Sequence, residues 1–94
     1  MEQKDNNKLF GVYEKKSNMP ETLIASNLSR RKAERLIFDM AKFEAKRTFS
    51  GNVTSNNNSI YITTEKIGKK RLCSVGETII SVGLYTFFLK TIKN

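Results

Sequence analysis

The chain has 94 residues, a net charge of +8 and 38% apolar residues, which predicts one small folded domain and excludes a largely disordered chain. The absence of histidine excludes the commonest general base and most zinc sites, and the excess of cations favours an acidic partner. The longest uncharged segment, residues 78–89, is too short for a membrane helix of about 20 residues, so no membrane span is predicted.

The N-terminal part of the chain is predicted to form a tail and a β-hairpin. Residues 1–8 are a polar tail by composition, and residues 9–94 form the single domain. Residues 9–14 and 22–26 are rich in strand-forming side chains. The stretch 15–20 between them holds serine, asparagine and proline, which are typical of turns. The two strands are therefore expected to pair as a hairpin.

Residues 30–47 are predicted to form an amphipathic helix. Ser29 is suited to the N-cap position, and apolar residues follow at helical spacing on one face. These apolar residues are Ala33, Leu36, Ile37 and Met40, with Phe43 near the edge. Residues 30–47 also hold seven cations and three anions, so the helix alone carries a net charge of +4.

Three cations, Arg30, Arg31 and Lys32, stand in the first turn of this helix and are called the first basic run. The positive end of the helix dipole favours carboxylates there by about 0.3–1 kcal/mol each, so cations do not serve stability at this position. We interpret the run as the start of a basic ridge, continued by Arg35, Lys42 and Lys46, that meets an anionic partner.

After the helix the composition favours strands. Residues 48–54 are predicted as one strand, with Phe49, Gly51 and Val53 on one face. Residues 59–66 and 71–75 are predicted to form a second hairpin, with Ile60 and Ile62 on one side of its first strand and Tyr61 and Thr63 on the other. Lys69, Lys70 and Arg71, called the second basic run, are expected at the hairpin tip.

Residues 77–92 are the hardest segment to assign, since their apolar side chains fit a buried strand or a buried helix. The β-branched and aromatic residues and the internal Gly83 favour a strand. An uncharged strand would promote aggregation at an exposed edge, so residues 78–89 are expected in the middle of the sheet or in a homodimer interface.

The pattern as a whole predicts an α+β domain of order ββαββββ. An N-terminal hairpin and one amphipathic helix are followed by three to four antiparallel strands, which form one sheet with the helix on one face.

The function favoured by this pattern is non-catalytic binding of nucleic acid, either DNA or RNA, through phosphate contacts. If both basic runs lie on one side of the fold, they can hold neighbouring phosphates. Tyr13, Tyr61 and Phe49 are candidates for stacking on bases. No catalytic residue, metal ligand or cofactor is predicted. The predicted nucleic-acid contacts are Arg30, Arg31, Lys32, Arg35, Lys42, Lys46, Lys69, Lys70 and Arg71.

Two other functions remain open from sequence. One is a protein-binding regulator or inhibitor, in which the same cations meet an acidic protein surface and the C-terminal strand adds to a partner's sheet or forms a homodimer. The other is a metal-free RNA-cleaving toxin in which Tyr85, Lys90 and Lys93 act on phosphate. The single cysteine, Cys73, and the absence of a signal-peptide pattern at the N-terminus favour a cytoplasmic location.

Overall fold

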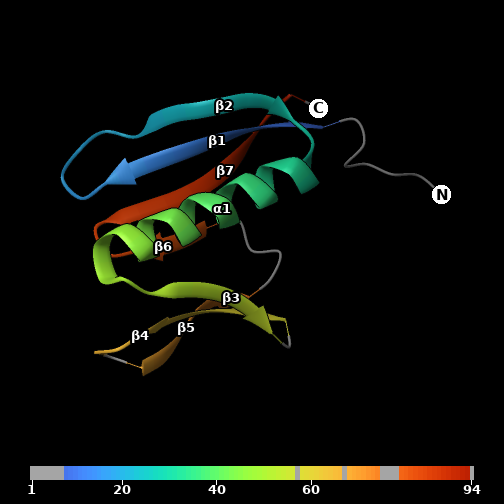
Figure 1. Cartoon of the computed structure of the whole chain (residues 1–94). Helices are drawn as coiled ribbons and strands as arrows, with labels where there is room; N and C mark the ends of the chain where they lie inside the picture. The colour runs from blue at the N-terminus through green and yellow to red at the C-terminus, as the bar shows by residue number, and fades with distance from the viewer. Residues whose placement is uncertain (1–7, 57, 67, 75–78, 94) are drawn as a thin grey trace.

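A computed structural model describes residues 8–56, 58–66, 68–74 and 79–93, and the α+β class is confirmed. Most of the predicted tail therefore lies outside the described residues. Figure 1 shows the arrangement of the elements. In chain order they are β1 (Leu9–Lys16), β2 (Thr22–Leu28), α1 (Arg30–Phe49), β3 (Asn52–Asn56), β4 (Ser59–Thr64), β5 (Gly68–Ser74), β6 (Ile79–Val82) and β7 (Tyr85–Lys93).

The strands form two antiparallel sheets, where the sequence predicted one. The first has the order β2-β1-β7-β6 and the second the order β3-β4-β5. Both edges of β1 are taken, one by β2 and the other by the C-terminal β7. The strands that directly follow the helix therefore have no place beside the N-terminal hairpin, and they pair with one another instead.

Helix α1 begins and ends at defined caps. The Oγ atom of Ser29 accepts a hydrogen bond from the backbone N–H of Lys32 at 3.3 Å, so the predicted N-cap is confirmed. Ser50 ends the helix in the left-handed conformation, with φ of 53°. The helix thus extends to Phe49, and the prediction of a strand from residue 48 was wrong. The capped last turn takes up residues 48 and 49, so β3 begins only at Asn52.

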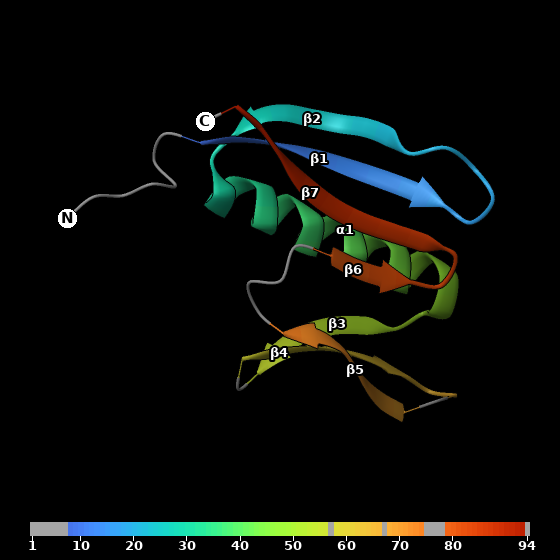
Figure 2. The same cartoon turned by 180° about the vertical axis from the view of Figure 1, so that it is seen from behind.

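Helix α1 covers one face of the four-stranded sheet (Figures 1 and 2). Its inner face is made of Ala33, Ile37, Ala41 and Ala45, all at most 1% exposed. Alanine at three of these positions removes side-chain bulk and so lets the helix approach the strands closely. Burial of the larger Ile37 contributes roughly 1.5–3 kcal/mol. The sheet supplies Phe10, Val12, Ile80, Val82, Phe87 and Leu89 to the same core, and the second sheet adds Val53, Ile60, Ile62 and Cys73.

The C-terminal apolar segment forms two strands, β6 and β7, where one continuous strand was predicted. Gly83 adopts a φ of +61°, which glycine tolerates without steric cost, and Val82 pairs with Tyr85 across the turn. β7 lies between β1 and β6, so the predicted position inside the sheet is confirmed for this strand. Residues 77 and 78 of the predicted segment 77–92 lie outside the described residues.

The hairpin of β4 and β5 confirms the predicted faces of β4 but moves the second basic run. Ile60 and Ile62 are buried, whereas Tyr61 and Thr63 point to the other side. The turn includes residues 65 and 66, and β5 begins at Gly68. The second basic run therefore lies within β5 rather than at the hairpin tip, because strand pairing begins earlier than the apolar pattern indicated.

Candidate nucleic-acid interface

The solvent-facing side of α1 carries five exposed cations, and we call this surface the outer face of α1. It consists of Arg31, Lys32, Arg35, Lys42 and Lys46. The inner-face residues sit on the opposite side of the helix, so these cations point away from the sheet. The first turn contains no carboxylate. Asp39 is exposed on the same stretch of helix, and no ion pair among the described residues joins it to Arg35 or Lys42.

Arg30 differs from the other cations of the first basic run. Its side chain is partly buried, and its Nε donates a hydrogen bond to Oε2 of Glu34 at 2.9 Å. Its guanidinium also lies 5.9 Å from the ring centroid of Phe10. These contacts give Arg30 a structural role at the junction of α1 and β1. Within the described ranges, by contrast, no ion pair or ring contact involves the side chains of Arg31 and Lys32.

At the C-terminal end of α1, the charged side chains are favoured by the helix dipole. Lys46 and Arg47 stand in the last turn, where the negative end of the helix dipole favours cations. In the middle of the helix, Nζ of Lys42 lies 5.3 Å from the ring centroid of Phe38. The cations in the second half of α1 are therefore compatible with helix stability. Only the first turn presents cations against the dipole.

The structure does not bring the two basic runs together. α1 begins at one end of the molecule, and the β4–β5 turn lies at the other end, beneath the point where α1 ends (Figures 1 and 2). Strand alternation also divides the second run, because Lys70 points to the opposite side of β5 from Lys69 and Arg71. The two runs therefore lie at opposite ends of α1, and the exposed Lys42 and Lys46 stand on the helix between them.

Two cations of the second basic run are held by neighbours in their own sheet. Nζ of Lys69 lies 4.5 Å from the ring centroid of Tyr61. Arg71 donates hydrogen bonds to Oγ of Ser74 at 2.6 Å and to Oγ of Ser59 at 3.1 Å. These contacts fix both side chains along the sheet. The stacking candidate Tyr61 thus lies beside Lys69 of the second basic run, and Tyr13 lies on the side of the four-stranded sheet that faces away from α1.

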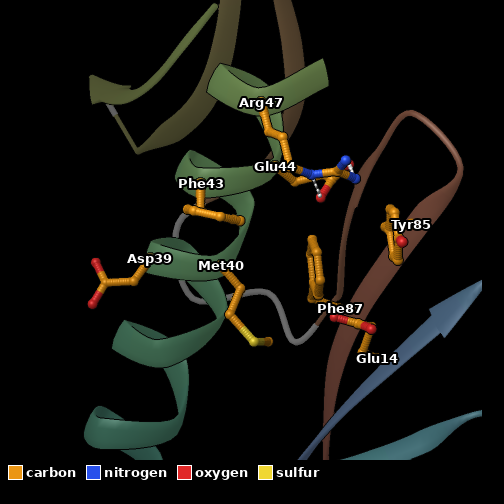
Figure 3. A pocket seen from close by; sticks show the side chains of 8 residues that line it. All are labelled: Glu14, Asp39, Met40, Phe43, Glu44, Arg47, Tyr85 and Phe87. Atoms are coloured by element: carbon orange, nitrogen blue, oxygen red, sulfur yellow. Dashed lines mark hydrogen bonds and ion pairs between the residues drawn. The ribbon is translucent and has the colours of Figure 1, made fainter. Parts of the chain in front are cut away.

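A pocket of about 430 Å³ lies between the C-terminal half of α1 and the neighbouring ends of β1 and β7 (Figure 3). Sequence reasoning missed it, because its walls come from three elements that are distant in the chain. The side chains that line it are Glu14, Asp39, Met40, Phe43, Glu44, Arg47, Tyr85 and Phe87. The rings of Tyr85 and Phe87 are parallel, with centroids 6.0 Å apart.

Glu44 is the one carboxylate of this pocket that is buried, and its oxygens are already occupied. Arg47 donates to Oε2 at 2.6 Å and to Oε1 at 3.3 Å, and the hydroxyl of Thr48 donates to Oε2 at 2.5 Å. The hydrogen bond to Glu44 raises the pKa of Arg47. The guanidinium also lies 6.0 Å from the ring centroid of Tyr85. Removing Arg47 would leave the buried charge of Glu44 without its ion-pair partner, so this carboxylate is held in a structural pair and is not a free general base.

The residues suggested for RNA cleavage are not assembled. Tyr85 points toward α1 and lines the pocket, whereas Lys90 lies on the opposite side of β7. The side chain of Lys93 lies outside the described part of the chain. Within the described ranges, no three His, Cys, Asp or Glu side chains are grouped so that they could hold a metal ion.

The side of the four-stranded sheet that faces away from α1 is the second notable surface, and we call it the uncovered face. Figure 2 shows this side in front of the helix. It carries Tyr13 and Phe88, whose rings are stacked with centroids 5.5 Å apart. Exposed aliphatic side chains flank them on β2 and β6. Sequence reasoning missed this surface, because its residues come from four different strands.

A comparison of the chain with protein-family models, curated proteins and solved structures finds no match. The described residues include no helix with the length and apolar content needed to cross a membrane.

Proposed function

We propose that this protein binds nucleic acid through the outer face of α1, by contacts to phosphate that do not depend on base sequence. The observation that carries the proposal is the cluster of five exposed cations on one solvent-facing side of a single helix. Arg31 and Lys32 carry it furthest, because they oppose the helix dipole and form no ion pair or ring contact in the part of the chain that the structure describes.

The dimensions of the helix support this proposal. A helix of 20 residues spans about 30 Å, and duplex DNA carries one negative charge for each 1.7 Å or so of its axis. The outer face can therefore contact several phosphates at once. Asp39 reduces the positive field only locally. Binding through such contacts positions a protein on the backbone and reads no sequence.

The test compares two triple variants that carry the same net charge. Arg31→Gln, Lys32→Gln and Arg35→Gln together remove three charges from the outer face of α1. Changing Lys69, Lys70 and Arg71 to Gln removes the same number from the second basic run. Fluorescence anisotropy with a labelled duplex and a labelled single strand measures the affinity of each variant.

The outer-face variant is expected to bind at least about tenfold more weakly than the wild type, because each lost phosphate contact removes counterion release. The variant of the second basic run should lose much less affinity. Equal losses of affinity in the two variants would show that binding depends on the net charge of the protein and not on the outer face of α1. No binding of the wild type to either probe at low salt would overturn the proposal.

A second candidate function, a protein-binding regulator, is favoured by the uncovered face. Its apolar side chains suit a protein partner better than a polyanion. A complex formed through that face should respond little to salt, whereas phosphate binding weakens steeply. We place either activity in the reducing cytosol as part of the proposal, since Cys73 is buried in β5 as a small core residue.

A further inference from the structure

One row of large apolar side chains crosses the uncovered face from edge to edge. Leu23 of β2 pairs with Tyr13 of β1, and Tyr13 pairs with Phe88 of β7. Phe88 in turn pairs with Ile79 of β6. Cross-strand partners place their side chains on the same side of a sheet. The four residues, called the apolar row, therefore form a continuous strip over all four strands.

The two ends of the apolar row are exposed, its two central rings are partly buried, and one more side chain extends it. Leu23 and Ile79, at its two ends, are each 52% exposed, and Ile92 is 42% exposed. A Cβ atom at Gly11 would lie 3.2–3.4 Å from side-chain atoms of Leu23, Tyr13 and Ile92. These three side chains thus converge above Gly11. Large contiguous apolar patches of this kind mark interaction sites.

The charges on the uncovered face do not fit a polyanion. Nζ of Lys90 lies 4.8 Å from the ring centroid of Tyr13 and 5.6 Å from that of Phe88. The same ammonium donates a hydrogen bond to Oε2 of Glu21 at 2.6 Å, so its charge is already paired. The exposed Lys15 flanks the row. The outer face of α1, by contrast, carries five exposed cations. The chemistry of the row therefore favours an apolar protein surface.

We propose that the partner of the apolar row is a second copy of this chain. The row reads aliphatic, aromatic, aromatic, aliphatic in both directions, so it is complementary to itself. A two-fold axis between the packed sheets, parallel to the strands, sets Leu23 of one copy against Ile79 of the other. It likewise sets Tyr13 against Phe88. Such an isologous interface buries both rows in a layer about 10 Å thick.

This arrangement also keeps the α1 cations of the two copies apart, whereas Lys90 and its partner Glu21 lie on the packed side. Because α1 lies on the other side of each sheet, both outer faces of α1 point outward on opposite sides of the dimer. Their mutual repulsion is therefore small. Within the segment 78–89 that sequence analysis associated with a homodimer, Ile80, Val82, Phe87 and Leu89 are buried in the core. Among the described residues of this segment, the exposed Ile79 and Leu84 and the partly buried Phe88 are available to a partner.

The test is the oligomeric state of neutral variants, measured by sedimentation equilibrium over a range of concentrations. Wild-type protein is expected at twice the 10.8 kDa chain mass at high concentration. Leu23→Gln combined with Ile79→Gln should weaken the dimer by about a hundredfold or more, because each change occurs twice in the interface. Ile24→Gln is the matched control, since Ile24 is 43% exposed and points to the other side of β2.

Circular dichroism and thermal unfolding establish that each variant is folded. A monomeric wild type at all concentrations would overturn the proposal, and so would a dimer that survives in the double variant. Loss of single-strand binding in the double variant, with a monomeric wild type, would identify the row as a base-stacking surface and refute the dimer. Because Gln leaves the net charge at +8, these outcomes are independent of phosphate binding by the outer face of α1.

Discussion

The two sides of the four-stranded sheet are made from the same strands and differ in what covers them. Phe87 and Leu89 of β7 are buried beneath α1, whereas Phe88 between them lies on the uncovered face beside the exposed Ile79. The helix that buries one side also presents the outer face of α1 to solvent. The five cations of the outer face of α1 and the apolar row thus lie on opposite sides of one small domain, and each can be altered without the other.

The largest expected change in the free energy of unfolding distinguishes a substitution on the covered side of the sheet from one on the uncovered face. Ile37→Ala should lower the free energy of unfolding by about 2–5 kcal/mol, because Ile37 is 1% exposed and its loss leaves a cavity under α1. Ile79→Ala should cost less than about 1 kcal/mol in dilute solution, since Ile79 is half exposed. Urea denaturation of both variants measures the difference. Equal costs would mean that the uncovered face is packed by something the fold does not show.

The next largest change in stability is expected from removing the N-cap of α1. Ser29→Ala removes the hydrogen bond between Oγ of Ser29 and the N–H of Lys32, and should cost about 1 kcal/mol. Ser29→Asp keeps an acceptor at the cap and adds a charge that the helix dipole favours, so it is the matched control. Thermal unfolding compares the two variants. If Ser29→Ala is as stable as the wild type, the cap does not determine where the helix begins.

Charge reversal in the first turn is expected to raise the free energy of unfolding slightly, whereas loss of the N-cap lowers it. Arg31→Glu and Lys32→Glu should each stabilise the fold by about 0.3–1 kcal/mol, because carboxylates suit the positive end of the helix dipole. Nucleic-acid affinity should fall at the same time. Arg30 is left unchanged, since it pairs with Glu34. Destabilisation of the charge-reversed variants would mean that Arg31 and Lys32 are structural.

The smallest effect is a pH dependence on the uncovered face. The hydrogen bond to Glu21 raises the pKa of Lys90 above its ordinary value of 10.5. A cation with a raised pKa stabilises the fold at neutral pH, and that contribution is lost as the pH rises through the pKa of Lys90. Glu21→Gln should lower this pKa in an NMR titration, with Glu14→Gln as control. An unchanged pKa in Glu21→Gln would contradict the pairing.

Local patterns predicted the parts of the fold that depend on neighbouring residues. The helix, its N-cap at Ser29 and the hairpin of β1 and β2 follow from spacing and turn composition within short segments. The division into two sheets could not be predicted, because it depends on the pairing of β1 with β7 at the other end of the chain. The turn at Gly83 was missed because apolar residues continue on both sides of it.

The candidate site, too, could be predicted only where it depends on neighbouring positions in the chain. Helical spacing was sufficient to place Arg31, Lys32 and Arg35 on a solvent-facing surface. It could not reveal that Arg30 contacts Phe10 of β1, or that the second basic run lies at the other end of the molecule. The apolar row is invisible in the sequence, since its four residues come from four strands.

The central claim is that the outer face of α1 binds phosphate, and the salt dependence of affinity tests it most directly. For duplex DNA, the logarithm of the association constant should fall with the logarithm of salt concentration with a slope of about −3 to −4.5, from three to five phosphate contacts. The triple Gln variant of Arg31, Lys32 and Arg35 should show a slope shallower by about 2 to 3. A flat salt response of the wild type, or an unchanged slope in this variant, would contradict the claim.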